Sequence, residues 1–112
     1  MDTPIALDCL RALAQEHRLA AFRALVQAGP TGLCVGELRQ ALDIPGPTLS
    51  SHLNQLRAAG LVKDHRDGRH IQLAADFQRM NALLAYLTEN CCAGAPCAPA
   101  SVCTPAIEEP AR

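Results

Sequence analysis

A polar-faced amphipathic segment followed directly by a hairpin turn constrains this chain more than any other feature. Between Pro47 and Gly60 the apolar residues recur at helical spacing, and they are Leu49, Leu53 and Leu56. This periodicity predicts a helix, with a proline suited to its first turn and a glycine suited to its end. Residues 61–66 and 70–73 then flank Asp67-Gly68, a pair typical of a two-residue β-hairpin turn.

The outer face of this predicted helix carries hydroxyls, amides and one guanidinium, from Thr48, Ser50, Ser51, Asn54, Gln55 and Arg57. Such groups can read base edges and hold phosphates. The hairpin adds three basic residues near its tip, which are Lys63, Arg66 and Arg69. An ordinary solvated helix beside a polar hairpin would have a similar composition. The direct succession of helix, glycine cap, hairpin and basic tip favours a surface that binds double-stranded DNA.

Two segments carry a family resemblance. The sequence PTLSSHLNQLRAAGLV resembles the recognition helix of the ArsR/SmtB winged helix-turn-helix repressors, and DHRDGRHIQL resembles their wing. The resemblance extends over residues 5–90. It implies a mainly α fold with a β-hairpin wing, in a dimeric bacterial repressor that a metal or metalloid releases from operator DNA. At Gly46 and Pro47 this sequence departs from many relatives, which carry polar residues there near the operator.

Charge is distributed unevenly along the chain, whose net charge is −1. Residues 45–75 carry +2, whereas residues 1–44 carry −1 and residues 76–112 carry −2. The positive share therefore coincides with the predicted DNA surface. Because this field is modest, affinity must come from a dimer and from specific contacts. Two Phe and one Tyr are too few for a base-stacking platform, which argues against a single-strand binder.

The length of 112 residues leaves room for one folded domain, which we predict over residues 1–90, with a Cys/Pro-rich, inducer-binding tail at residues 91–112. No apolar run is long enough for a membrane span, and residues 1–4 lack the basic start of a signal peptide. We therefore expect a cytoplasmic protein without a membrane partner. No Ser-His-Asp order, phosphate loop or paired carboxylate stands out, so we do not expect an enzyme.

Further helices are predicted from Thr3-Pro4 onward, over Glu16–Ala28, from Gly32 onward, and over Asp76–Asn90. The expected inward residues of the middle two helices are Leu19, Phe22, Leu25, Val26, Val35, Leu38 and Leu42. His17 and Arg18 are interpreted as solvated first-turn residues. The first and last helices carry apolar stripes consisting of Ile5, Cys9, Leu13, Phe77, Met80, Leu84 and Leu87. These stripes exceed what one small domain can cover and predict a helical homodimer interface.

Two inducer sites that the family resemblance implies are missing or incomplete. Zinc, cobalt and nickel sensors place histidines and carboxylates along the last helix, but no histidine follows His70. Other metal sensors carry two cysteines two residues apart, where this chain has Cys34 followed by Gly36. A soft metalloid needs several thiolates, so Cys34 is interpreted as a leftover or structural cysteine. Cys9 is interpreted as a small buried apolar residue, in preference to a ligand lent to a second protomer.

The remaining four cysteines cluster near the C-terminus, at Cys91, Cys92, Cys97 and Cys103. Cys91 falls four residues after Leu87 and is expected to prolong the last helical stripe, and Cys97 can return through the turn at residues 94–96. Three thiolates suit a pyramidal As(III) or Sb(III) centre, or an organic arsenical, with Cys103 as an alternative third ligand.

Several alternatives use the same thiols. One is a zinc- or cadmium-type thiolate site, although adjacent cysteines share one tetrahedron poorly. Another is a redox switch that acts by disulfide formation. A third is a metal-binding appendage without effect on DNA. A metal carrier is disfavoured because it has no use for the helix and hairpin at residues 47–73.

Overall fold

The computed structural model describes residues 1–94. Its helices are α1 (Thr3–Leu13), α2 (Glu16–Ala28), α3 (Val35–Leu42), α4 (Gly46–Ala58) and α5 (Phe77–Leu87), and its strands are β1 (Leu33–Cys34), β2 (Val62–Asp67) and β3 (His70–Ala75). A short 3-10 turn, η1, spans Cys91–Gly94. The strands form an antiparallel sheet in the order β1-β3-β2. The mainly α fold with a β-hairpin is therefore confirmed.

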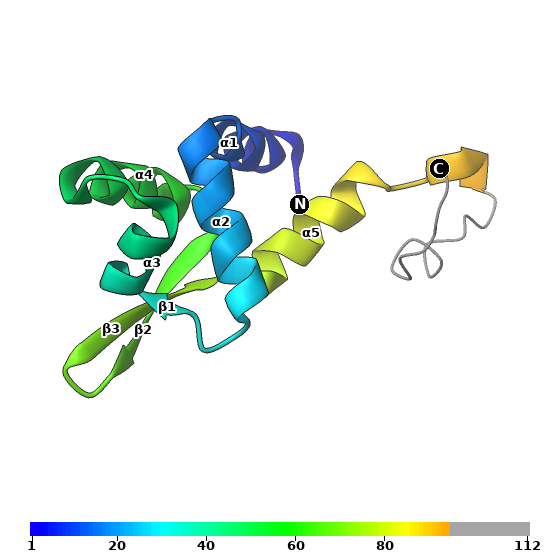
Figure 1. Cartoon of the computed structure of the whole chain (residues 1–112). Helices are drawn as coiled ribbons and strands as arrows, with labels where there is room; N and C mark the ends of the chain where they lie inside the picture. The colour runs from blue at the N-terminus through cyan, green and yellow to red at the C-terminus, as the bar shows by residue number, and fades with distance from the viewer. Residues whose placement is uncertain (95–112) are drawn as a thin grey trace, which may run out of the picture.

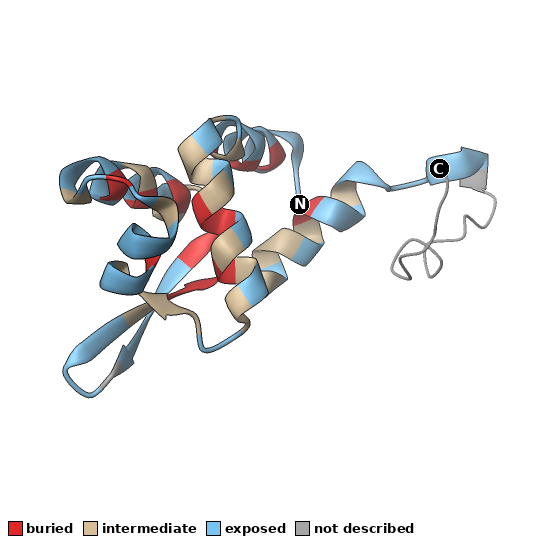
Figure 2. Ribbon diagram, in the orientation of Figure 1, coloured by how far each residue is buried: buried red, intermediate tan, exposed pale blue. Residues whose placement is uncertain are grey.

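Helix α2 lies at the centre of the molecule and contacts α1, α3, α4 and β3 (Figure 1). The buried residues concentrate where α2, α4 and the sheet meet, whereas the far end of α5 is exposed (Figure 2). The largest fully buried side chains are Leu25, Leu38, Leu49, Leu53, Leu56, Leu61, Leu73 and Cys9. The predicted apolar face of α4 is thus confirmed, since it supplies Leu49, Leu53 and Leu56 to this core.

A glycine cap ends α4 and directs the chain into β2. Gly60 has φ +79°, its N–H donates to the Arg57 carbonyl at 2.9 Å, and the Leu61 N–H donates to the Leu56 carbonyl at 3.0 Å. This pair of bonds is the Schellman arrangement, which favours glycine at the left-handed position. The predicted role of Gly60 is confirmed. The cap fixes the direction in which the hairpin leaves the helix.

The hairpin turn lies one residue later than predicted. Asp67 pairs with His70, so the two turn residues are Gly68 and Arg69 instead of Asp67 and Gly68. Gly68 has φ +66° at the first turn position, which is the glycine position of a type II′ turn. The shift places Arg69 at the very tip of the hairpin.

Three other predictions need correction. The chain is extended at Leu33–Cys34, where β1 pairs with β3, so the third helix begins only at Val35. Leu19 is 44% exposed, because the buried face of α2 is rotated toward Ala21, Phe22 and Leu25. Leu19 lies instead along an apolar groove between α2 and α5. The last helix ends at Leu87, three residues before the predicted end.

The first turn of α2 is also less solvated than predicted. Arg18 and His17 are both half-buried. The Arg18 Nε–H donates to the Ala12 carbonyl at 2.7 Å, which satisfies a backbone acceptor near the end of α1. Arg18 therefore joins α1 to α2. No described helix is long and apolar enough to cross a membrane.

Candidate nucleic-acid interface and thiol turn

The polar side of α4 faces solvent opposite its buried leucines. Its exposed residues, here called the reading face, are Thr48, Ser50, Ser51, Asn54 and Gln55. The helix begins at Gly46-Pro47, and the preceding Pro45 supplies no side-chain cap to the first turn. Uncapped N–H groups at a helix start attract anions. The amphipathic geometry predicted for this helix is therefore present, with its start open to solvent.

Arg57 has a different position from the rest of the predicted polar set. Its Nε–H donates to Asp64 Oδ1 at 3.0 Å, and its Nη1 donates to Asn54 Oδ1 at 2.9 Å. The Arg57–Asp64 pair is partly exposed, so its contribution to stability is modest. Its geometric effect is clearer, because it links α4 to β2. Arg57 thus helps to fix the hairpin relative to the reading face.

The β2–β3 hairpin, here called the wing, divides its basic residues between base and tip. Lys63 pairs in register with Ala74 near the base of the wing, whereas Arg66 pairs with Ile71 close to the tip and Arg69 lies in the turn. All three basic side chains are exposed. The expectation that Lys63 lies near the tip is therefore wrong. The wing and α4 both lie at the end of the molecule away from α5 (Figure 1).

A histidine pair lies between α4 and α2, and no pattern in the sequence indicated it. The ring centroids of His17 and His52 are 5.7 Å apart. His52 Nδ1 is buried and has no hydrogen-bond partner among the described residues. Burial lowers the pKa of His52, and the positive charge of Arg18 and the proximity of His17 lower it further. The lowered pKa disfavours protonation of this ring, which lies on the α2 side of α4.

The thiol turn, residues Cys91–Gly94, does not continue α5. Asn90 has φ +56° and Cys92 has φ +59°, both in the left-handed region. The prediction that Cys91 prolongs the stripe of Leu87 is therefore wrong, because the helix ends at Leu87 and Asn90 leaves the helical conformation. Cys91 and Cys92 are exposed. Within residues 1–94 no group of three or more His, Cys, Asp or Glu side chains is placed to hold a metal ion.

The two other predicted ligands, Cys97 and Cys103, lie outside the described residues, as does the tail from residue 95 onward. The structure therefore describes only half of the predicted thiol set. Cys91 and Cys92 are the members whose position is known, and they follow α5 directly.

Cys9 and Cys34 both have structural surroundings. Cys9 is fully buried, and its Sγ donates to the Ala59 carbonyl at 3.6 Å. Burial raises the pKa of the Cys9 thiol, and Arg79 partly offsets the effect. The prediction of a buried Cys9 is confirmed, whereas its place in an exposed dimer stripe is wrong. Cys34 caps α3, and its N–H donates to Glu37 Oε1 at 2.9 Å, which lowers the pKa of Glu37.

The other stripe residues of α1 and α5 differ in exposure. Ile5 is 37% exposed, Leu84 is 52% exposed and Leu87 is 54% exposed. The half-buried members are Leu13, Phe77 and Met80, which pack against the core. The Thr3 and Tyr86 hydroxyls form a hydrogen bond between the start of α1 and the end of α5. The exposed apolar residues Ile5, Leu84 and Leu87 therefore lie on two helices that this hydrogen bond connects.

An exposed polar helix, a basic two-stranded wing and supporting helices behind them define a winged helix-turn-helix protein. The sequence model of a helix-turn-helix domain matches residues 13–65. Among solved structures, the chain is similar to an ArsR-like transcriptional regulator from Rhodococcus sp. RHA1, with TM-score 0.69, 26% identity, and coverage of 81% of this chain and 82% of that one. It is also similar to NolR from Sinorhizobium fredii, with TM-score 0.61, 31% identity, and coverage of 77% and 83%.

Three curated relatives are similar over the same region. The repressor SmtB of Mycobacterium tuberculosis is 42% identical over 64 residues, 57% of this chain and 45% of SmtB. The cadmium resistance regulatory protein CadC of Lactococcus lactis is 37% identical over 68 residues, 61% of this chain and 56% of CadC. The arsenic resistance regulator ArsR1 of Pseudomonas putida is 38% identical over 68 residues, 61% of this chain and 49% of ArsR1.

The chain thus spans about half the length of the curated relatives it matches. It belongs to the ArsR/SmtB family of winged helix-turn-helix transcriptional regulators. Proteins of this family are regulators and not enzymes, in agreement with the prediction from the sequence.

Proposed function

We propose that this protein is a cytoplasmic repressor that binds double-stranded operator DNA as a homodimer and releases it when a trivalent metalloid binds C-terminal thiolates. The observation that carries the DNA part is the exposed reading face of α4 beside the basic tip of the wing. Hydroxyl and amide groups on a rigid helix suit base edges, and arginines at a hairpin tip suit phosphates. The reading face enters the major groove in this proposal.

A second copy of the chain is part of the proposal. Leu84, Leu87 and Ile5 expose apolar surface on α1 and α5. Apolar side chains gain free energy when a partner removes them from water. Two-fold symmetry would then present two reading faces to half-sites separated by about one DNA turn, or a multiple of it. Dimerisation also doubles the number of phosphate contacts, which offsets the modest positive charge of one protomer.

The proposed inducer is As(III), with Sb(III) and organic arsenicals as members of the same chemical class. Cys91 and Cys92 supply two thiolates, Cys97 the third, and Cys103 an alternative third. Exposed thiols directly after α5 support this assignment. Helix α5 holds no histidine, aspartate or glutamate, so the thiols that follow it are the ligands that this proposal uses. Sulfur favours soft acceptors over harder ions.

The relatives divide among inducers, since their names include cadmium resistance and arsenic resistance. A three-thiolate site with two adjacent cysteines favours pyramidal arsenic over a tetrahedral ion, whose four ligands must spread evenly. The thiol alternative, a redox-sensing repressor, uses the same exposed pair and needs only an oxidant. Arsenite and hydrogen peroxide, applied separately to the same DNA complex, distinguish the two inducers.

Release requires the metalloid to bind more tightly to the form that cannot hold DNA. The left-handed residues at Asn90 and Cys92 offer a place for this difference. Ligation of Cys91 and Cys92 would reorder the segment after Leu87, next to the exposed end of α5. A small displacement of α5 in a dimer would change the spacing of the two reading faces. A coupling of about 1–3 kcal/mol is enough to alter affinity several-fold to a hundredfold.

Mobility-shift titration with the DNA upstream of the protein's own gene tests the reading surface. Arg69→Gln should weaken binding to all duplexes similarly, because a phosphate contact carries no sequence information. Gln55→Ala and Ser51→Ala should change the order of preference among operator variants, by about 1–3 kcal/mol for each hydrogen-bonded base that the side chain no longer reaches. Operator affinity that stays unchanged in all three variants would contradict the proposal.

A further inference from the structure

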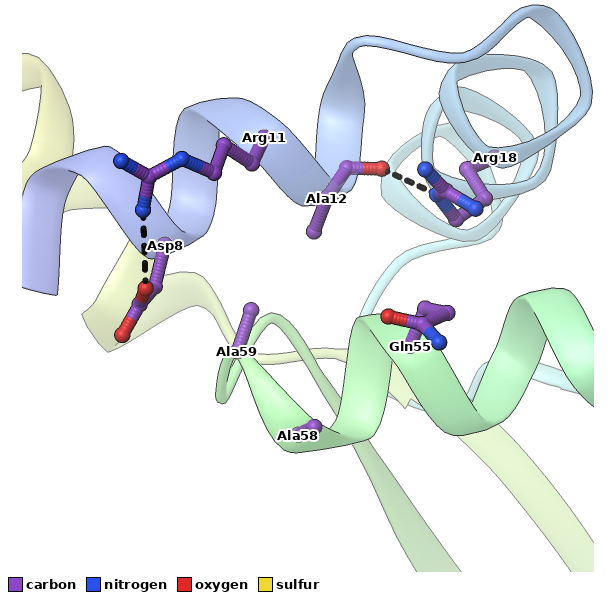
Figure 3. A pocket seen from close by; sticks show the side chains of 7 residues that line it. All are labelled: Asp8, Arg11, Ala12, Arg18, Gln55, Ala58 and Ala59. Atoms are coloured by element: carbon purple, nitrogen blue, oxygen red, sulfur yellow. Dashed lines mark hydrogen bonds and ion pairs between the residues drawn. The ribbon is translucent and has the colours of Figure 1, made fainter.

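A polar groove lies between α1 and the C-terminal half of α4, on the side of α4 away from the wing (Figure 1). Its lining residues are Asp8, Arg11, Ala12, Arg18, Gln55, Ala58 and Ala59. Three of these are alanines, so small side chains leave the groove open (Figure 3). Asp8 and Arg11 lie toward one end, and Arg18 and Gln55 lie toward the other.

The two arginines of the groove differ in how firmly they are held. Arg18 is half-buried, and only its Nε–H is bonded to the Ala12 carbonyl in the described structure, at 2.7 Å. A guanidinium has five N–H donors, so its terminal groups keep donor capacity. Arg11 pairs with Asp8 at 3.4 Å, and both side chains are about two-thirds exposed. Such an exposed pair is weak and exchanges readily for another anion.

The groove is continuous with the reading face, because Gln55 belongs to both. Helix α4 lies between α1 and the wing, and it contacts both. A helix in the major groove has a phosphate strand on each flank, and the wing tip supplies cations on one flank. The other flank of α4 is the groove, with a net charge of +1 from its ionisable side chains.

We propose that the α1/α4 groove is a second phosphate site, which holds a phosphodiester of the duplex through Arg11 and Arg18 while α4 reads the adjacent bases. This inference rests on the proposed DNA-binding function and names a contact beyond the predicted surface of α4 and the wing. Arg11 leaves Asp8 for the phosphate, and Arg18 contributes its terminal donors without losing the bond to Ala12. Asp8 opposes binding, because its carboxylate competes for Arg11 and repels phosphate.

The test compares four proteins in duplex binding over a salt series, namely wild type, Arg11→Gln, Asp8→Asn and Arg23→Gln. Arg23 is the matched control, since it is an exposed arginine on α2 that lines the separate apolar groove beside α5. Arg11→Gln should lower affinity for all duplexes, on the order of fivefold at low salt. It should also reduce the slope of log affinity against log salt by about 0.9 per protomer. Asp8→Asn should raise affinity.

Opposite signs at Arg11 and Asp8, with no change of slope at Arg23, support the site. Equal slopes for wild type and Arg11→Gln overturn it while leaving the proposed function intact. If the wild type binds no duplex, both fail. Inorganic phosphate provides the remaining arm, measured by thermal stabilisation of the DNA-free protein. Stabilisation at millimolar phosphate that Arg11→Gln removes, together with equal salt slopes for wild type and Arg11→Gln, would assign the groove to a small anion and overturn the assignment to DNA.

Discussion

The reading face of α4 and the thiol turn differ in how firmly the rest of the chain holds them. The reading face is fixed from behind by Leu49, Leu53 and Leu56, and from its end by the glycine cap at Gly60. The thiol turn follows a helix whose last residues are exposed, and it contains left-handed non-glycine residues. A surface that recognises DNA benefits from being preformed, whereas a sensor benefits from an element that a ligand can reorder.

The largest effect expected from this difference concerns the core. Leu53→Ala should lower the free energy of unfolding by about 2–5 kcal/mol, because it leaves a cavity behind α4. Cys92→Ser, in the exposed thiol turn, should change it by less than about 0.5 kcal/mol. Denaturant unfolding of both variants at one protein concentration measures the contrast. Equal destabilisation by the two changes would remove the distinction between the regions.

The next effect concerns α5, the helix that precedes the thiol turn and carries the proposed dimer contact. Leu84 is 52% exposed in one chain, so Leu84→Glu should not disturb the fold of that chain. In a dimer the carboxylate would be buried without a partner. We expect dimer affinity to fall about a hundredfold, close to 3 kcal/mol. Sedimentation of wild type and variant at micromolar concentration provides the measurement, and a wild-type monomer would refute the interface.

A smaller difference in stability is expected between alanine substitutions at two glycines, Gly60 and Gly36. Gly60→Ala should destabilise the fold by about 1–2 kcal/mol, since the residue has φ +79° and a methyl group would meet the Arg79 guanidinium at 2.8 Å. Gly36→Ala is the matched control, because its nearest neighbour would be Cys34 Sγ at 4.0 Å and alanine favours a helix. Thermal unfolding should therefore move in opposite directions for the two variants. An unchanged unfolding temperature for Gly60→Ala would show that the glycine cap does not contribute to stability.

The smallest effect is the pH dependence of the α2–α4 contact. The pKa of His52 in the folded chain lies below its ordinary value near 6.5, so the unfolded chain binds the extra proton first. Stability from this group is complete above about pH 6.5 and falls as the pH drops below that value. His52→Gln should flatten the decline. A decline of the same steepness in the variant would assign acid sensitivity to other groups.

The sequence predicted what depends on long, regular patterns. Helix α2 has the predicted bounds, and the buried leucines and glycine end of α4 are as expected, because periodicity and a left-handed glycine are local signals. Strand β1 was missed because two residues carry no period, and only pairing with Leu73 and Gln72 makes them a strand. Leu19 was misplaced because periodicity predicts the apolar side of a helix but does not say which residues on that side a neighbouring element will bury.

The candidate site was predictable to a different extent. The polar residues of α4 could be read directly, since they alternate with the buried leucines along one helix. The contacts of Arg18, Arg57 and His52 could not be predicted, because they join separate elements. Cys91 was misplaced since the pattern continues past Leu87, whereas Asn90 adopts a left-handed conformation that asparagine tolerates. Patterns within one helix or turn can therefore be recognised in the sequence, whereas contacts between separate elements cannot.

The most direct test is arsenite titration of a preformed complex of operator DNA and protein, with wild type compared with a Cys91→Ser/Cys92→Ser variant. Fluorescence anisotropy of labelled DNA reports release. We expect both proteins to bind DNA with equal affinity in the absence of arsenite, because the reading face and wing are unchanged. Arsenite should release wild type and leave the variant bound, and Cys34→Ser should respond as wild type does. Full release of the double variant by arsenite would contradict the account.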